Sequence, residues 1–198
     1  MKIATVGSCQ AMALNWYIRQ LRPDDEVKWC AIELFSNWHT TIPQDKHNEL
    51  WLDQGSYNIY ETKPAIEYLK SADYIVYQCI NSEKSKLFNP DQIQLYKKTS
   101  TKTCTLPYFK VCHDEIDPLA GLKERERKMK LDFKISDILL FNDKKAAFKF
   151  NSNGVHPNSA LCLEIVRNIC NVLNWPFYSD KQYIELIESY YPFGKYPI

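Results

Sequence analysis

Two side chains in this chain are suited to nucleophilic chemistry, the thiol of Cys9 and the imidazole of His156. Cys9 stands in Gly-Ser-Cys-Gln near one end of the sequence, and His156 stands in Gly-Val-His-Pro-Asn near the other. Taken singly, each has a plainer interpretation, because a cysteine is often a small apolar core residue and a lone histidine is more often structural. A thiol nucleophile needs a neighbouring base, however, and an imidazole can serve as one. We therefore predict that the two side chains meet in one cleft.

The residues around Cys9 predict a turn between a strand and a helix. Residues 3–6 are apolar, which indicates a strand buried on both faces, and Gly7 ends it. From Gln10 onward apolar residues recur with helical spacing, at Leu14, Tyr17, Ile18 and Leu21. Chemistry in an open α/β sheet usually takes place at such turns. Free backbone N–H groups and the helix dipole at this position favour the thiolate of Cys9.

The residues around His156 predict a stiff loop before a second helix. An apolar segment at 146–150 precedes the loop, and a buried helical stripe follows it, made of Cys162, Ile165, Val166, Ile169, Cys170 and Leu173. Pro157 restricts the backbone at the helix entry, and Asn158 or Ser159 can cap the first turn. His156 is therefore placed to reach into a cleft.

Strands and helices alternate along the rest of the chain. Further strands are predicted at 27–32, 74–78 and 102–106, and further helices at 63–70, 119–131, 135–142 and 180–190. This alternation predicts an α/β three-layer sandwich of the flavodoxin type, in which a mostly parallel sheet has helices on both faces. We expect one domain over residues 1–198, with an aromatic tail at about 188–198 that packs back on it or forms a partner surface.

Three short motifs resemble the SGNH (GDSL-like) superfamily. The turn at 7–9 resembles its Gly-Asp-Ser motif, with Cys9 in the place of the serine. The loop at 153–156 resembles its Asp-x-x-His motif, with Asn153 in the place of the aspartate. The stretch at 73–81 resembles the strand that leads to the oxyanion motif of this superfamily. The resemblance implies that Gln78 or Asn81 stabilises an oxyanion, together with backbone N–H groups at Ser8–Gln10. The glycine that the superfamily has after its second strand is absent here.

A narrower resemblance covers residue 2 to about residue 175. Gly-x-Cys-Gln at the start, the glutamine Gln78 after Asp-Tyr-Ile-Val-Tyr, Leu-Pro-Tyr-Phe at 106–109 and the late His-Pro motif are together similar to the WcbI family of capsule-polysaccharide enzymes. Membership would imply an SGNH-like fold, binding of coenzyme A and acetyltransferase activity. Two positions depart from that family: Ser8 replaces an asparagine, and Asn158-Ser159 replaces Thr-Asn.

The resemblance implies transfer of an acetyl group from acetyl-coenzyme A to a sugar or polysaccharide hydroxyl. In one mechanism the Cys9 thiolate carries the acyl group and His156 moves the proton. In the other, His156 deprotonates the acceptor directly and the Cys9 region only positions the thioester. Asn153 orients the imidazole in either case, but it lacks the charge of an aspartate. A thiol-dependent esterase and a non-catalytic module that binds coenzyme A or a glycan are the alternatives.

The phosphates of coenzyme A need cationic partners. The stretch 123–130 offers Arg125, Arg127 and Lys128, and guanidinium forks suit phosphate well. The same stretch also has oppositely charged residues four positions apart, which is typical of a solvated helix face. The predicted helix starts at Gln10 and at Asn158–Ser159 offer further anion sites.

Composition limits the remaining classes of function. The 198 residues are 25% charged with a net charge of +1, so no basic field favours nucleic acid. Seven irregularly spaced cysteines, with no signal peptide and no apolar run of membrane length, lead us to expect a reduced cytoplasmic protein. We expect no metal, because Cys104, Cys112 and His113 lack the spacing of ligands. The expected partners are a small acyl donor and a carbohydrate acceptor.

Overall fold

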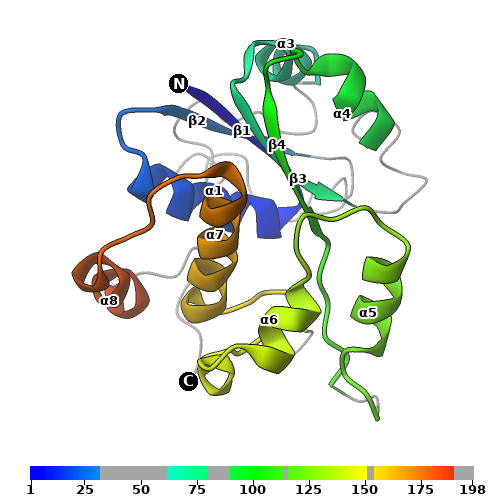
Figure 1. The fold of residues 1–198 in the computed structure, drawn as a ribbon, viewed down its shortest axis with the longest axis vertical. Coiled ribbons are helices and arrows are strands. Elements are labelled where there is room, and N and C mark those ends of the chain that lie inside the picture. Colours follow the sequence, from blue (N-terminus) through cyan, green and yellow to red (C-terminus); the bar gives the residue numbers. More distant parts are fainter. Residues whose placement is uncertain (32–61, 80–89, 114–115, 151–153, 190–198) are drawn as a thin grey trace, which may run out of the picture.

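The computed structural model describes residues 1–31, 62–79, 90–113, 116–150 and 154–189 (Figure 1). Four strands and seven α-helices, with one 3-10 turn, lie in these ranges. In chain order they are β1 Lys2–Gly7, α1 Cys9–Leu21, β2 Glu26–Ala31, α3 Thr62–Ser71, β3 Tyr74–Cys79, α4 Pro90–Tyr96, β4 Lys102–Pro107, α5 Ala120–Arg127, α6 Ile135–Phe141, η2 Lys145–Ala147, α7 Ser159–Leu173 and α8 Asp180–Ser189. The predicted aromatic tail lies outside the described residues from position 190 onward.

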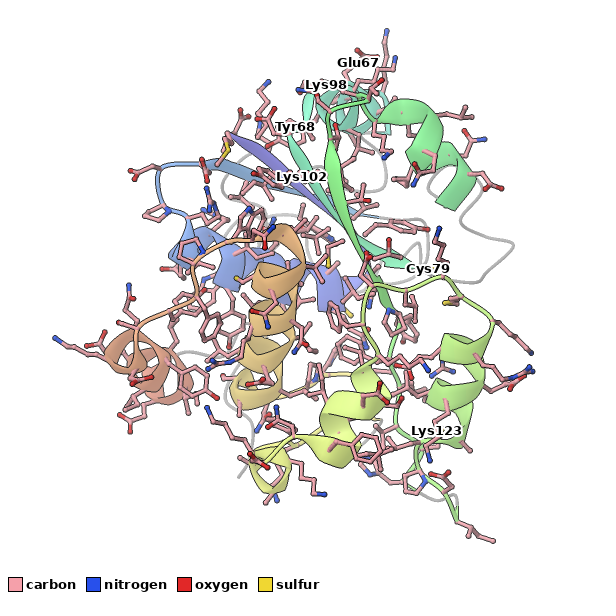
Figure 2. All side chains as sticks on the ribbon, viewed as in Figure 1. Glu67, Tyr68, Cys79, Lys98, Lys102 and Lys123 are labelled. Carbon is pink, nitrogen blue, oxygen red and sulfur yellow. The ribbon has the colours of Figure 1, made fainter. Side chains whose placement is uncertain are left out.

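The four strands form one parallel sheet in the order β2-β1-β3-β4. The register aligns Gly7 with Ala31 on one side of β1, Val6 with Tyr77 on the other, and Cys79 with Pro107. The carboxyl ends of all four strands therefore meet at one edge, and Figure 2 shows Cys79 at that end of the sheet. The chain runs from β1 to β2 on one side and returns to β3 on the other. The carboxyl ends of β1 and β3 thus flank the point where the connections change direction, which is where open α/β sheets bind ligands.

Helices cover both faces of the sheet (Figure 1). Alternate strand residues point to opposite faces. Ile3 and Val76 share a core with α1, α5, α6 and α7, while Ala4 and Ile75 share a second core with α3 and α4. The predicted three-layer α/β arrangement is therefore what the described residues form.

The predicted element boundaries agree closely, with two differences. Helix α4 was not predicted, because its seven residues make only about two turns, too few for a helical stripe to be recognised. The helix predicted at 119–131 already ends at Arg127. Leu122 packs in the core beneath α1 and α7, whereas Met129 packs against the core on the opposite face. A continuous helix would not carry the chain from one core to the other over so few residues.

Two further findings concern the class of protein. All seven cysteines lie in the described ranges, and all are free thiols. Among the helices that the structure describes, none is long and apolar enough to cross a membrane.

Candidate functional site

The structure brings Cys9 and His156 together. The Sγ atom of Cys9 lies 3.2 Å from Nε2 of His156, although the two residues are 147 positions apart in sequence. Cys9 begins α1 directly after β1, and His156 precedes α7. The pair therefore sits at the carboxyl edge of the sheet, as predicted from the sequence.

The turn that carries Cys9 is tied to the neighbouring strand β3. Gly7 has φ 150°, and a Cβ there would lie 2.6 Å from the Cβ of Gln78, so only glycine allows this approach. The backbone N–H and the hydroxyl of Ser8 both donate to Oε1 of Gln78, at 3.0 and 2.6 Å. The Ser8 hydroxyl also accepts from the N–H of Gln10 at 3.2 Å, which caps α1. These contacts fix where the helix starts and hence where the thiol points.

The loop that carries His156 is held against the chain that follows β4. Gly154 has φ +69°, and a Cβ there would lie 1.7 Å from the carbonyl oxygen of Val111. The N–H of Val111 donates to the carbonyl of Gly154 at 2.9 Å. After His156, Asn158 caps α7 by accepting from the N–H of Leu161 at 3.2 Å. His156 is thus held by backbone contacts on both sides.

Both members of the pair are neutral at pH 7. Burial raises the pKa of the Cys9 thiol to about 12, although the N–H of Gln10, the Ser8 hydroxyl and the N–H of Cys9 itself act in the opposite direction. Burial also lowers the pKa of His156 below its usual 6.5. A protonated thiol can donate to Nε2 when the imidazole carries its proton on Nδ1, and this is the tautomer that suits His156 as a base. The backbone N–H groups at the helix start favour the thiolate, as predicted, but desolvation of the sulfur raises the pKa by more than they lower it.

Three residues predicted to contact an oxyanion or substrate instead form the support behind the pair. Ser8 and Gln78 are 0% exposed and Gln10 is 1% exposed, so their side chains do not reach a bound molecule. The N–H groups of Ser8 and Gln10 are also used within the turn, by Gln78 and by the Ser8 hydroxyl. The prediction that these three side chains contact an oxyanion or a substrate is therefore wrong. The N–H groups of Gln10 and Cys9 both lower the pKa of the Cys9 thiol, and the Cys9 N–H stays a predicted oxyanion donor.

The three cations predicted to hold phosphate differ in their exposure and in their hydrogen-bond partners. Arg127 and Lys128 are exposed and bind Glu124, with contacts of 3.0 and 2.8 Å, and these bonds hold the pKa of Glu124 at about 2. They form the solvated helix face that was the alternative interpretation. Arg125 is half-buried; its Nη2 donates to the carbonyl of Lys110 at 3.3 Å, and its solvent-shielded Nε has no hydrogen-bond partner among the described residues.

Tyr108 was not predicted as a site residue, although the motif at 106–109 contributed to the family resemblance. Burial raises the pKa of this phenol, loss of the Cys9 proton would raise it further, and the Arg125 guanidinium lowers it. Both Cys9 and Arg125 therefore affect the pKa of this phenol, which is half-buried and packs against the core that α3 and α4 share. Tyrosine has no spacing signature of its own, so only the fold could identify it.

Of the remaining predicted site residues, two lie at the start of α7 and two lie outside the described residues. Asn158 uses its Oδ1 to cap α7 and its Nδ2 to hold the carbonyl of Ala147 at 2.9 Å. Ser159 is buried in the first turn of the same helix. Asn81 and Asn153 lie outside the described residues, so their predicted roles stay predictions.

The geometry around Cys9 is that of a thiol with an adjacent neutral base at the ligand-binding edge of a parallel sheet. The parts of the chain described contain no group of three His, Cys, Asp or Glu side chains arranged to hold a metal ion. No protein-family model, curated protein or solved structure matches the chain.

Proposed function

We propose that this protein is an acyltransferase that takes an acyl group from a coenzyme A thioester and passes it, through Cys9, to a hydroxyl. The observation that carries the proposal is the 3.2 Å contact between Cys9 Sγ and His156 Nε2 at the carboxyl edge of the sheet. A thiol that is protonated at rest becomes nucleophilic when the adjacent base removes its proton during attack. The contact supports the covalent mechanism over direct activation of the acceptor, because the base already faces the thiol.

In the first half-reaction, Nε2 of His156 accepts the thiol proton while Cys9 Sγ bonds to the thioester carbonyl carbon. The developing oxyanion needs a hydrogen-bond donor, and the Cys9 N–H is the backbone group that we propose for this role. The bond from that carbon to the coenzyme A sulfur then breaks, and the departing thiolate takes the proton from His156. The products are acyl-Cys9 and coenzyme A.

In the second half-reaction, Nε2 of His156 accepts the proton of the acceptor hydroxyl as its oxygen bonds to the acyl carbon. The bond from that carbon to Cys9 breaks, and the thiolate recovers its proton from His156. The resemblance to capsule-polysaccharide enzymes suggests a sugar as the acceptor. Seven free cysteines fit a cytoplasmic protein, the compartment we propose for it.

The chemistry of the nucleophile favours a thioester donor over an ester. Exchange of one thioester for another conserves the type of bond, whereas an oxygen ester would have to be converted into the less stable thioester. Among the cations that the sequence predicts to bind phosphate, Arg125 has no carboxylate partner in the described ranges, so it is our candidate for holding an anionic donor. Coenzyme A supplies both a thioester and phosphates.

The decisive experiment is to incubate the protein with acetyl-coenzyme A and to map acetylated peptides by mass spectrometry. We expect an acetyl group on Cys9 that is absent from Cys9→Ala and strongly reduced in His156→Gln. Cys112→Ala is the matched control: it removes the most accessible thiol and should keep the adduct. Coenzyme A release is then measured with a panel of sugars.

Each of the other results identifies a different function. Release of coenzyme A at the same rate with and without sugars would indicate hydrolysis, and hence a thiol-dependent esterase. Thermal stabilisation by coenzyme A without an adduct on Cys9 would indicate a binding module. An adduct that persists in Cys9→Ala would refute the assignment of the nucleophile.

A further inference from the structure

The side-chain amide of Gln10 is bonded at every position within the protein. Its Nε2 donates to the carbonyl of Val155 at 2.6 Å and to the carbonyl of Phe109. Its Oε1 accepts from the N–H of Phe109 at 3.2 Å and from Nε2 of Gln78. An amide has two donors and two acceptor sites, so none is left over.

These four bonds connect the two halves of the site. Gln10 follows Cys9 directly in α1, and Val155 precedes His156 directly in its loop. The amide group is planar and rigid. Its hydrogen bond to the Val155 carbonyl therefore restrains the distance between Nε2 of His156 and Sγ of Cys9. Gln78 adds a brace, because it also binds the turn at Ser8.

No other side chain reproduces this set of bonds. Glutamate has the same shape but no donors, so its carboxylate would face the carbonyl oxygens of Phe109 and Val155. Asparagine is one methylene shorter, and alanine leaves buried polar groups without partners. A glutamine at this position is therefore specific to the geometry of the loop.

We propose that Gln10 is a positioning residue, which sets the contact between Cys9 and His156 through the Val155 carbonyl. The proposal rests on the proposed function, in which that contact transfers the proton. It assigns Gln10 no contact with substrate.

The test compares Gln10→Ala and Gln10→Glu with Asn15→Ala. Asn15 is a matched control, since it is a buried amide on the same helix that donates to Thr5 Oγ1 at 2.9 Å, far from the His156 loop. The first readout is the rate of Cys9 acetylation by p-nitrophenyl acetate, which needs no recognition of coenzyme A. The second is the pKa of His156, followed by NMR.

In both Gln10 variants, acetylation of Cys9 by p-nitrophenyl acetate should be about 10- to 100-fold slower. A displacement of the His156 ring by about 1 Å can reduce the rate by that factor. In both, the pKa of His156 should rise toward its ordinary value as the loop loosens and the ring gains solvent. Asn15→Ala should change neither quantity, although it lowers stability.

Wild-type acetylation and an unchanged His156 pKa in a folded Gln10 variant would overturn the proposal. So would equal effects in Asn15→Ala, because these would indicate a general loss of packing. If Gln10→Ala does not fold, Gln10→Glu decides the comparison. Absence of any acetylation in the wild type would count against the proposed function, and the His156 pKa would still decide the role of Gln10.

Discussion

Replacing Gly154 by alanine tests whether the His156 loop is held as tightly as the structure shows. The new Cβ would lie 1.7 Å from the Val111 carbonyl oxygen, whereas real Cβ contacts are essentially never under 3.0 Å. The loop must therefore move by at least 3.0 − 1.7 = 1.3 Å. His156 lies two residues further on, so its ring should move with the loop.

Both stability and rate should fall. An L-residue at this positive φ costs about 1–2 kcal/mol. Loss of the bond from the Val111 N–H to the Gly154 carbonyl costs about 1 kcal/mol more. The total of about 2–3 kcal/mol corresponds to a fall in Tm of roughly 4–12 °C for a chain of this length. Displacement of the base should slow acylation of Cys9 about a hundredfold.

The measurement is calorimetry together with the p-nitrophenolate burst from p-nitrophenyl acetate. Gly121→Ala is the matched control, because its Cβ would lie 3.6 Å from Nη1 of Arg125, an ordinary contact in a helix. That variant should be more stable by about 0.5–1 kcal/mol and keep the wild-type rate. A Gly154→Ala protein with wild-type Tm and burst would refute the reasoning from loop contact to catalysis.

Three further outcomes are expected. The acylation rate should rise with pH and then stay level, because the base is the neutral ring of His156. Burial lowers the pKa of His156, so the midpoint of the rise should lie below pH 6.5. A midpoint above pH 6.5 would contradict this. Cys112 is half-buried and the other six thiols are buried, so N-ethylmaleimide should label Cys112 first. Peptide mapping checks this, and faster labelling of Cys9 would contradict it. Saturating coenzyme A should stabilise the wild type by about 2.7 kcal/mol at a hundredfold excess over Kd. Arg125→Ala should lose much of that thermal shift and Arg127→Ala almost none, and equal losses would remove Arg125 from the site.

The fold was predictable because its signals are local. Buried parallel strands show as short apolar runs, and the helices over them show as stripes, so both α1 and α7 were predicted within one residue of their ends. Helix α4 is too short to show a stripe and was missed. The position of Cys9 after β1 was predictable in the same way. The segment at 146–150 before His156 forms no strand of the sheet, so the approach of His156 to Cys9 depends on the contacts of its loop with Val111 and Gln10.

The roles of the polar residues were less predictable. A glutamine aimed at a ligand and one saturated by backbone groups look the same in a sequence, and Gln10 proved to be saturated. The protonation of Cys9 depends on how deeply the completed fold buries it, which no local motif records. The need for Gly154 arises from Val111, a residue far away in the chain.

The central place of β1 in the sheet affects the protein while it is being made. Cys9 leaves the ribosome 147 residues before His156, which is about 7–30 s at about 5–20 residues per second. During the first half of that interval the strand β3, which pairs with one side of β1, is not yet complete, and the helix α7 that covers α1 is absent throughout. The thiol then has its ordinary pKa of about 8.5. The nascent chain is therefore more easily oxidised or alkylated at Cys9 than the folded protein, and synthesis is the period in which this thiol most needs a reducing environment.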